Sequence, residues 1–297
     1  MQVINMGELD NNFRTKWAKG SLWEMAKHAQ VITLIGAGGK TTCLQILTQE
    51  IHAAGYPVIA TTTTKVYPDN QARPWRHANP PPFKSQGIYF WYTGEEQGSG
   101  KWLGNSPSMV DKAVWRDGEN LISHENGSAY RRYWIIEGDG ARERRLKCWA
   151  SHEPQIPRSS DCGVLILDGR LWGQELKDED IHRSEYCPYL VHSQFTEENA
   201  WRYLGKSPVF YPQYQHLAWV IFFNIPRRPV HGLSIQAESS EGAYFSGLSV
   251  PEPEVLLDAL YRKGAEEMRF KGEAKPRSLR LAAGDAKGGE LQWFDLW

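Results

Sequence analysis

VITLIGAGGKTTCLQILTQEIHAAGYPVIATTTT, residues 31–64, is the stretch that decides the fold of this chain. Its β-prone start, residues 31–35, runs into a glycine-rich loop, and apolar residues then recur at helical spacing over residues 41–54 until a glycine ends the pattern. A second β-prone run, residues 58–61, follows directly. The stretch therefore predicts a strand, a tight loop, a helix and a second strand. The loop should lie at the carboxyl end of a parallel strand, where α/β proteins bind ligands.

The loop itself has the composition of a phosphate-binding loop. Its three glycines allow consecutive backbone N–H groups to turn inward at the start of a helix, where the helix dipole adds partial positive charge. Lys40 adds an ammonium group, and the hydroxyl of Thr41 occupies the position at which a P-loop binds Mg²⁺. The spacing GxGGKTT is shorter than the common GxxxxGK[ST] and resembles the compact P-loop of the Mur-ligase group. The residues expected to bind a nucleotide are Gly36, Ala37, Gly38, Gly39, Lys40, Thr41 and Thr42.

A second stretch, YWIIEGDGARERRLKCWASHEPQIP (residues 133–157), places carboxylates directly after an apolar run. This run should form a strand beside the one that precedes the glycine loop, which would bring Glu137 and Asp139 to the phosphate site. One carboxylate there can hold Mg²⁺ and the other can orient an attacking water. We expect Thr41 and Asp139 to bind the metal and Glu137 to position the water. The expected catalytic residues are Lys40, Glu137 and Asp139, and the alternative is that both acids lie in a solvated turn.

Basic and histidine-containing segments follow this acidic pair. The patch from Arg142 to Lys147 is dense in positive charge and can bind phosphate or an anionic substrate, or it can be a solvated turn. Two later loops combine histidine with glutamate or arginine, which are groups able to transfer protons or bind metal, although neither loop has HExxH spacing. The candidate substrate- or anion-binding residues are Arg142, Lys147, His152, Glu153, His182 and Arg183.

Bulk composition restricts the function to local sites. The 297 residues carry a formal net charge of −1, which gives no general attraction to nucleic acid or to an acidic membrane surface. No apolar run approaches the ~20 residues that span a bilayer, so we expect a cytoplasmic protein. The four cysteines are scattered without a CxxC motif, and we expect reduced thiols rather than disulfides or a thiolate zinc site.

The pattern along the whole chain is that of an α/β protein. It predicts a three-layer fold of the P-loop NTPase type with a mostly parallel sheet. We expect a P-loop α/β domain over residues 20–270, an N-terminal tail over residues 1–19 and a C-terminal extension over residues 271–297. The expected strands are residues 31–35, 58–61, 88–92, 133–137, 163–167 and 218–223, and the expected helices are residues 21–29, 41–54, 108–115, 197–204 and 253–270.

Four segments carry a family resemblance. LIGAGGKTT, ATTTTKVYP, EGDGARERRLKCWASHEPQIP and DEDIHRSE, in this order, resemble the YqeC-type proteins, which are described as selenium-cofactor biosynthesis or selenium-dependent molybdenum hydroxylase accessory proteins. The resemblance covers roughly residues 22–204. It implies a P-loop protein that binds ATP or GTP with Mg²⁺ and acts in the maturation of a selenium-dependent molybdenum hydroxylase. The implied partners are such a hydroxylase or its cofactor-synthesis proteins.

One segment departs from the family pattern. FFNIPRRP, residues 222–229, falls where the family tends to have Asn-Lys-x-Asp, and here Ile225 and Arg227 replace the lysine and the aspartate. The carboxylate that would accept hydrogen bonds from guanine is therefore missing, and we expect ATP to bind at least as well as GTP. Two other functions remain open, a Mur-ligase-like ATP-dependent ligase and a nucleotide-gated chaperone that inserts a cofactor with little catalysis.

Overall fold

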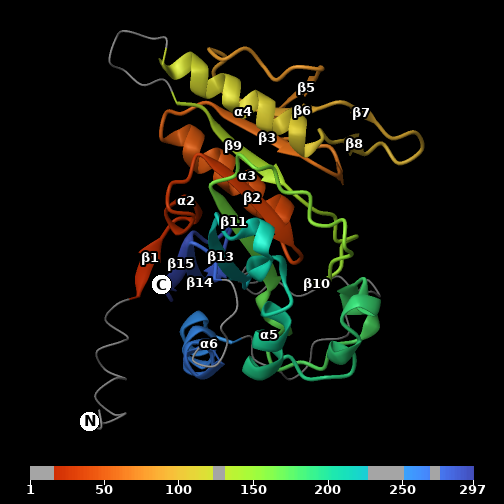
Figure 1. The fold of residues 1–297 in the computed structure, drawn as a ribbon, viewed down its shortest axis with the longest axis vertical. Helices are drawn as coiled ribbons and strands as arrows, with labels where there is room; N and C mark the ends of the chain where they lie inside the picture. The colour runs from red at the N-terminus through yellow and green to blue at the C-terminus, as the bar shows by residue number, and fades with distance from the viewer. Residues whose placement is uncertain (1–16, 123–130, 227–250, 268–274) are drawn as a thin grey trace, which may run out of the picture.

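The computed structural model describes residues 17–122, 131–226, 251–267 and 275–297. Within these residues a ten-stranded sheet runs through the centre of the molecule, in the order β1-β15-β14-β13-β11-β2-β9-β3-β6-β5 (Figure 1). Strands from β14 to β5 pair in parallel, and β15 and β1 add antiparallel to one edge. The strands of this sheet are β1 (Ala18–Gly20), β2 (Val31–Gly36), β3 (Val58–Thr62), β5 (Arg73–Arg76), β6 (Ile88–Tyr92), β9 (Tyr133–Glu137), β11 (Cys162–Asp168), β13 (Ala218–Asn224), β14 (Ser278–Asp285) and β15 (Glu290–Asp295).

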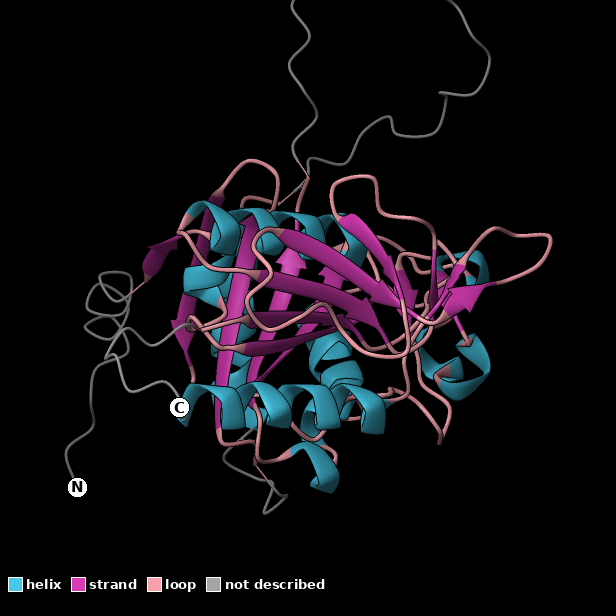
Figure 2. Ribbon diagram, turned by 90° about the horizontal axis from the view of Figure 1, so that it is seen from above, coloured by secondary structure: helices cyan, strands magenta, loops and turns pink. Residues whose placement is uncertain are grey.

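The central strands are apolar because helices cover both faces of the sheet. Every residue of β2, β9 and β11 is buried, as expected for parallel strands with two covered faces. Successive side chains enter opposite layers: Leu34 packs on the side of α2 and α3, and Ile35 packs on the side of α5 and α6. α4 covers the part of this second face that β3 and β9 form. Figure 2 shows helices on both sides of the strands.

The helices are shorter than the predicted ones at one end of the chain and longer in the middle. They are α2 (Leu22–Met25), α3 (Lys40–Ala53), α4 (Pro107–Ile122), α5 (Glu197–Leu204) and α6 (Pro253–Glu267). α2 begins with a capping box at Ser21 and stops early, because Lys27 and His28 have φ angles of 58° and 51°, which a right-handed helix cannot include. The last predicted residues of the final helix lie outside the described residues.

Two small sheets and several 3₁₀ turns lie outside the main sheet. The two small sheets consist of β4 (Lys65–Val66), β8 (Trp102–Leu103) and β7 (Gly94–Glu95), and of β10 (Leu146–Lys147) and β12 (Ile181–His182). The 3₁₀ turns are η1 (Gly169–Leu171), η2 (Asp178–Asp180), η3 (Ser184–Tyr186), η4 (Pro188–Leu190), η5 (Pro208–Phe210) and η6 (Pro212–Tyr214). Among the described helices, none is long and apolar enough to cross a membrane.

Both ends of the chain contribute strands to the main sheet, which corrects the predicted boundaries. β14 lies parallel to β13, and β15 returns antiparallel beside it, so residues 278–295 are not an extension outside the domain. β1 pairs with β15, with Ala18 opposite Trp293. Without β14 the outer edge of β13 would have unpaired backbone groups, and β14 pairs with it along its whole length.

The parallel strands deliver their last residues to one edge of the sheet. Residue pairing aligns Leu34 with Glu137, and Ile166 with Gly36. It also aligns Asp168 with Asn224, which in turn lies opposite Gly284 of β14. The expected α/β architecture with a mostly parallel sheet is confirmed, and this edge gathers the polar residues that follow β2, β9, β11, β13 and β14.

Candidate functional site

The glycine loop makes a tight turn against the neighbouring strand β11. Gly36 and Gly38 have φ angles of 96° and 93°, which only glycine adopts without strain. A Cβ at Gly36 would lie 2.3 Å from the carbonyl oxygen of Ile166, and a Cβ at Gly38 would lie 2.4 Å from the backbone nitrogen of Asp168. Glycine is therefore required at both positions by backbone angle and by space.

The loop ends at the N-terminus of α3 with its backbone donors open. The first N–H groups of a helix have no acceptor within the helix, and the cap residue Gly39 offers no side chain to accept from them. Among the described residues, no acceptor faces the N–H groups from Gly38 to Thr42, and the first bonded donor of the helix is Cys43, whose N–H donates to the Gly39 carbonyl at 2.9 Å. A row of open donors at a helix N-terminus is a site for an anion.

Lys40 lies under this row rather than in solvent. Its ammonium donates to the carbonyl oxygen of Gly36 at 2.5 Å and lies 3.2 Å from a carboxylate oxygen of Asp139, and its side chain is 5% exposed. The lysine thus contributes a positive charge to the floor of the loop.

Asp139 is fully buried and is held by protein donors on both oxygens. Its carboxylate accepts from the backbone N–H of Gly36 at 3.0 and 3.1 Å and from the indole N–H of Trp149 at 2.8 Å, in addition to its contact with Lys40. It does not line the cleft described below. Both oxygens therefore anchor the glycine loop, and Mg²⁺ binding by Asp139 stays a prediction.

Glu137 is the carboxylate that faces the open space. It ends β9, is 7% exposed, and lines the cleft beside Thr41, with which its carboxylate forms a side-chain hydrogen bond. Burial raises the pKa of Glu137 to about 7, against the opposing effect of the nearby Lys40 ammonium. A buried acid poised near neutrality beside a hydroxyl is a natural partner for a cation or a water. Neither acid lies in a solvated turn, so that alternative is wrong.

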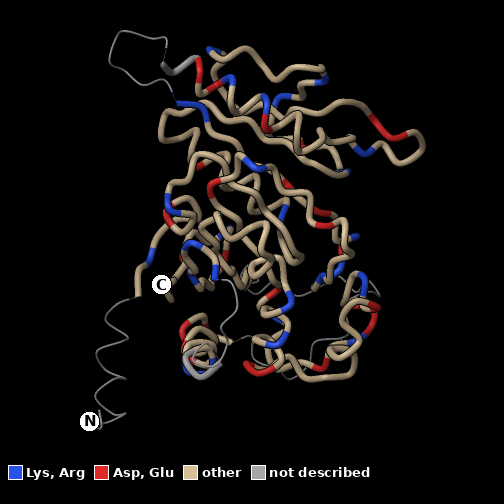
Figure 3. Tube along the Cα trace, viewed as in Figure 1, with Lys and Arg blue, Asp and Glu red and all other residues tan. Residues whose placement is uncertain are grey.

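A cleft of about 1010 Å³ opens over the loop, which is large enough for a nucleotide. Nine lysines and arginines and six acidic residues line it. This excess of positive charge, in a chain whose net charge is −1, favours an anionic ligand. Figure 3 shows residues of both signs along the connection from β9 to β10, which forms one wall.

The predicted basic patch divides between the cleft and the interior. Arg142 and Arg144 are exposed and line the cleft. The side chain of Lys147 is fully buried instead; its ammonium donates to the Gly140 carbonyl at 2.5 Å and to Glu153 at 3.1 Å. Carboxylate and carbonyl oxygens thus surround the Lys147 ammonium, and binding of a substrate anion by this residue stays a prediction.

The two histidine-containing segments also differ in position: His182 lines the cleft and His152 does not. His182, Arg183 and Glu153 line the cleft together, and the Arg183 guanidinium lies 2.9 Å from the Glu153 carboxylate. Burial lowers the pKa of His182 to about 4, with Lys147 and Arg183 adding to the effect, so this imidazole is neutral at pH 7. His152 is exposed and is not among the residues that line the cleft, so its place in the site stays a prediction. Within the described residues, no three His, Cys, Asp or Glu side chains form a metal-binding group.

Several residues of the cleft were not predicted as site residues. Asp168 follows the predicted strand 163–167 and is buried between Arg145 and Arg170, at 3.0 and 2.7 Å. The strand-end rule that identified Glu137 would also have found it. Tyr67 and Lys101 face each other at another wall, with the ammonium 4.5 Å from the ring centre. The remaining unpredicted charged or polar residues of the lining include Lys65, Glu96, Asn224, Asp285 and Lys287.

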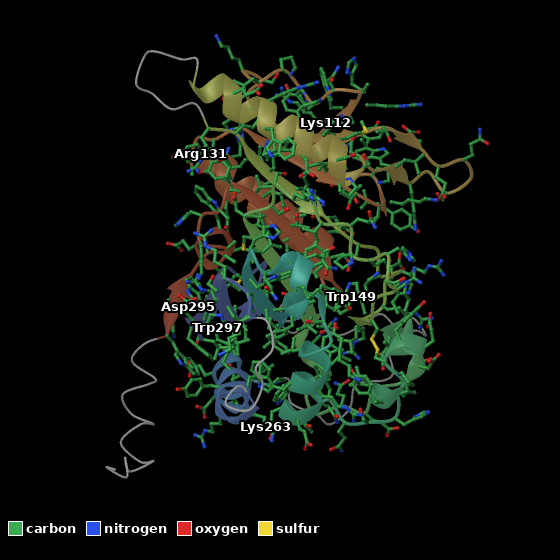
Figure 4. The ribbon with its side chains drawn as sticks, in the orientation of Figure 1. Lys112, Arg131, Trp149, Lys263, Asp295 and Trp297 are labelled. Carbon is green, nitrogen blue, oxygen red and sulfur yellow. A yellow bond between two sulfur atoms is a disulfide. The ribbon has the colours of Figure 1, made fainter. Side chains whose placement is uncertain are left out.

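A disulfide joins the two segments that carry the basic patch and the HRSE motif. Cys148 and Cys187 are bonded, with their Cα atoms 6.2 Å apart (Figure 4, yellow bond). Pairing of β10 with β12 brings them together although 39 residues separate them in sequence. The expectation of four reduced thiols is wrong for this pair, while Cys43 and Cys162 are free and buried.

Comparisons with known proteins assign a family to the part of the chain that forms this site. The model of the YqeC protein family matches residues 32–185. The chain is also similar to the uncharacterized protein YqeC of Escherichia coli (strain K12), with 31% identity over 162 residues. That alignment covers 53% of this chain and 59% of the relative's length. No solved structure matches the chain significantly. Because the family match includes the glycine loop, the strand-end acids and the basic patch, and covers more than half of the chain, this protein belongs to the YqeC family.

Proposed function

We propose that this chain binds a nucleoside triphosphate with Mg²⁺ at the glycine loop of residues 36–42 and hydrolyses its terminal phosphate. The observation that carries this proposal is the row of open N–H groups from Gly38 to Thr42 at the start of α3. Phosphate oxygens accept hydrogen bonds from such donors, and the helix dipole and Lys40 add positive charge at the same place.

The residues around the loop suit a bound Mg²⁺ ion. The Thr41 hydroxyl and the Glu137 carboxylate are oxygen donors that share one side of the loop and one hydrogen bond. Mg²⁺ prefers oxygen ligands and is usually held by one or two protein groups together with phosphates and waters. When bound there, it would neutralise charge on the phosphate oxygens.

Glu137 and Asp139 would then do different work. Glu137 faces the cleft and can accept a hydrogen bond from an attacking water or from a water on the metal. Asp139 holds the Gly36 N–H and the Lys40 ammonium, and so keeps the loop in its phosphate-accepting form. Lys40 is charged at the floor of the loop and can move from the Gly36 carbonyl to a phosphate oxygen.

The family resemblance supports a place for this activity in the maturation of selenium-dependent molybdenum hydroxylases. Hydrolysis coupled to a partner would be slow in isolation and faster when the partner is present. If this chain is a nucleotide-gated chaperone, a purified hydroxylase that lacks its cofactor should increase the rate at which the chain releases phosphate.

Phosphoryl transfer to an anionic acceptor, as in an ATP-dependent ligase, is a second candidate. It is favoured by one observation: the cleft continues past the loop to the exposed side chains of Arg142 and Arg144 and to Arg183. Guanidinium groups bind carboxylates and phosphates in two-point fashion. A ligase would release phosphate only when an acceptor is present and would form a new covalent bond to it, and mass spectrometry of the acceptor distinguishes the two functions.

Calorimetry with Mg²⁺-triphosphate tests the binding proposal. Lys40→Ala should weaken affinity by about 100-fold, since a charge-assisted contact to phosphate is lost. Lys112→Ala is the matched control, because Lys112 is an exposed lysine on α4 that does not line the cleft (Figure 4). Equal affinity for wild type and Lys40→Ala, with unchanged melting behaviour, would reject the assignment.

A further inference from the structure

The cleft extends beyond the glycine loop that forms its floor. Its volume of about 1010 Å³ lies at the upper end of the range that holds one drug-sized ligand. Two walls continue past the loop: the first consists of residues 64–67 with Lys101, and the second of residues 140–145 with Arg183. A triphosphate bound at the loop therefore leaves room for a second ligand between these walls.

The first wall is fixed beside Glu137. The N–H of Thr63, which directly precedes this wall, donates to the Glu137 carbonyl at 3.0 Å. β4 pairs with β8, and Trp102 of β8 stacks on Tyr92 of the main sheet, with ring centres 4.4 Å apart. The wall therefore stands on the side of the loop where we expect Mg²⁺ and the terminal phosphate.

Tyr67 presents an open aromatic ring on this wall. Large apolar side chains are exposed at five places among the described residues, and Tyr67 is the one of these that lines the cleft. The Lys101 ammonium lies over the ring at 4.5 Å from its centre, whereas the residue as a whole is 57% exposed, so the other face of the ring is open. An open aromatic face at a binding cleft is a platform on which a planar ring can stack.

The second wall offers guanidinium groups. Arg142 and Arg183 both line the cleft and have φ angles of 49° and 63°, a left-handed conformation that few residues other than glycine adopt. Such conformations are concentrated at binding sites. The Glu153 carboxylate, 2.9 Å from Arg183, holds that guanidinium through one of its five N–H donors. Guanidinium groups in this setting suit the oxygens of a phosphate.

We propose that the cleft binds a second ligand beside the triphosphate, a planar aromatic compound that carries a phosphate group, as a mononucleotide does. Its ring stacks on Tyr67, and its phosphate lies at Arg142 and Arg183. The inference rests on the proposed triphosphate site and gives the chemical class of the acceptor next to it.

Calorimetry with AMP as the probe tests this site, in protein first saturated with Mg²⁺ and a non-hydrolysable ATP analogue so that the glycine loop is filled. The ATP form follows the expected preference for ATP, which depends on residue 227, lies outside the described residues and stays a prediction. Adenosine lacks the phosphate, and ribose 5-phosphate lacks the ring. We expect AMP to bind at least about 10-fold more tightly than either fragment, because each fragment loses the contacts of one wall.

Variants separate the two walls. Tyr67→Ala should weaken AMP by about 5- to 150-fold, the range for loss of one base stack, and should leave the affinity for the ATP analogue unchanged. Tyr67→Phe keeps the ring and should bind AMP as wild type does. Arg142→Gln should weaken AMP by about 10-fold without changing adenosine. Trp115→Ala is the control, because Trp115 is an exposed aromatic residue on α4 that does not line the cleft.

The outcomes distinguish this inference from the proposed function. If Tyr67→Ala weakens the ATP analogue, the ring contacts the base of the triphosphate and the second site is overturned. The same holds if saturated protein binds no AMP at millimolar concentration, or binds it no more tightly than the fragments. If wild type binds no triphosphate, the proposed function has failed; the second site then stands only if AMP binds wild type and Lys40→Ala equally and Tyr67→Ala more weakly.

Discussion

Asp139→Asn should destabilise the fold strongly, because this carboxylate joins the glycine loop to the protein interior. Its oxygens accept from the Gly36 N–H at 3.0 Å and from the Trp149 indole at 2.8 Å, and the Lys40 ammonium lies 3.2 Å away. An amide has one acceptor oxygen, so its NH₂ group must face one of these donors. The charge that compensates the buried Lys40 is lost as well.

The magnitude follows from burial. Removing one partner of a buried ion pair costs about 3–5 kcal/mol, whereas a hydrogen bond to a charged group contributes about 1.5–3 kcal/mol. These two figures overlap, since they describe the same groups, and we expect a total near 4 kcal/mol. For a chain of this size each kcal/mol lowers the melting temperature by about 2–4 °C, so the expected decrease is about 8–16 °C.

Urea and thermal unfolding followed by tryptophan fluorescence measure this loss, since the chain contains 13 tryptophans. Glu143→Gln is the control, because Glu143 is an exposed acid in the same connection, and its removal should change stability by less than about 0.5 kcal/mol. A loss below about 1 kcal/mol in Asp139→Asn would refute the anchoring role. A metal ligand would behave differently: its loss would weaken nucleotide binding with Mg²⁺ and leave binding without Mg²⁺ unchanged, whereas we expect Asp139→Asn to weaken both.

Three further predictions concern the acid in the cleft, the loop glycines and the disulfide. Burial raises the pKa of Glu137 to about 7, so the free protein loses stability as pH rises from the ordinary glutamate range through about 7, and Glu137→Gln should be relatively more stable at pH 8 than at pH 5. Mg²⁺-dependent nucleotide binding should strengthen over the same rise in wild type and not in Glu137→Gln, and titrations at several pH values measure both effects. Gly38→Ala should reduce triphosphate affinity by more than about 100-fold, because the added Cβ would lie 2.4 Å from the backbone nitrogen of Asp168. The control is Gly55→Ala: Gly55 also has a positive φ, +91°, but open space around it, so this variant should lose only stability, by about 1 kcal/mol. Equal triphosphate affinities in the two variants would contradict the prediction. Maleimide labelling of denatured, unreduced protein should modify two cysteines and leave the Cys148–Cys187 pair unlabelled, and labelling of all four by mass spectrometry would contradict the disulfide.

Local patterns were sufficient to predict the centre of the fold. The strand before the glycine loop, the loop and the following helix are close in sequence, and each has a strong signal: five β-prone residues, positive-φ glycines and helical spacing of Leu44, Leu47 and Ile51. The rule that parallel strands end at one edge predicts that Glu137 lies beside Thr41. The strand, loop and helix depend on chemistry within about thirty residues of chain, and the approach of Glu137 to Thr41 depends on the pairing of β2 with β9.

Features that depend on partners far away in sequence were missed. β14 contains alanines and a glycine that give no strand signal alone, and it is a strand because β13 and β15 pair with it on both sides. The sequence shows that Glu137 and Asp139 are two residues apart, but it does not show the contacts with Gly36, Lys40 and Trp149 that hold Asp139 in the interior. Lys147 likewise has the composition of a surface cation and is buried because Glu153 lies beside it.

Co-crystallisation with a non-hydrolysable triphosphate analogue and Mg²⁺ tests the central claim most directly. We expect phosphate oxygens about 3 Å from the backbone nitrogens of Gly38 to Thr42, with Thr41 and Glu137 on the metal side. A triphosphate bound elsewhere in the cleft, or an empty glycine loop at saturating analogue, would contradict it.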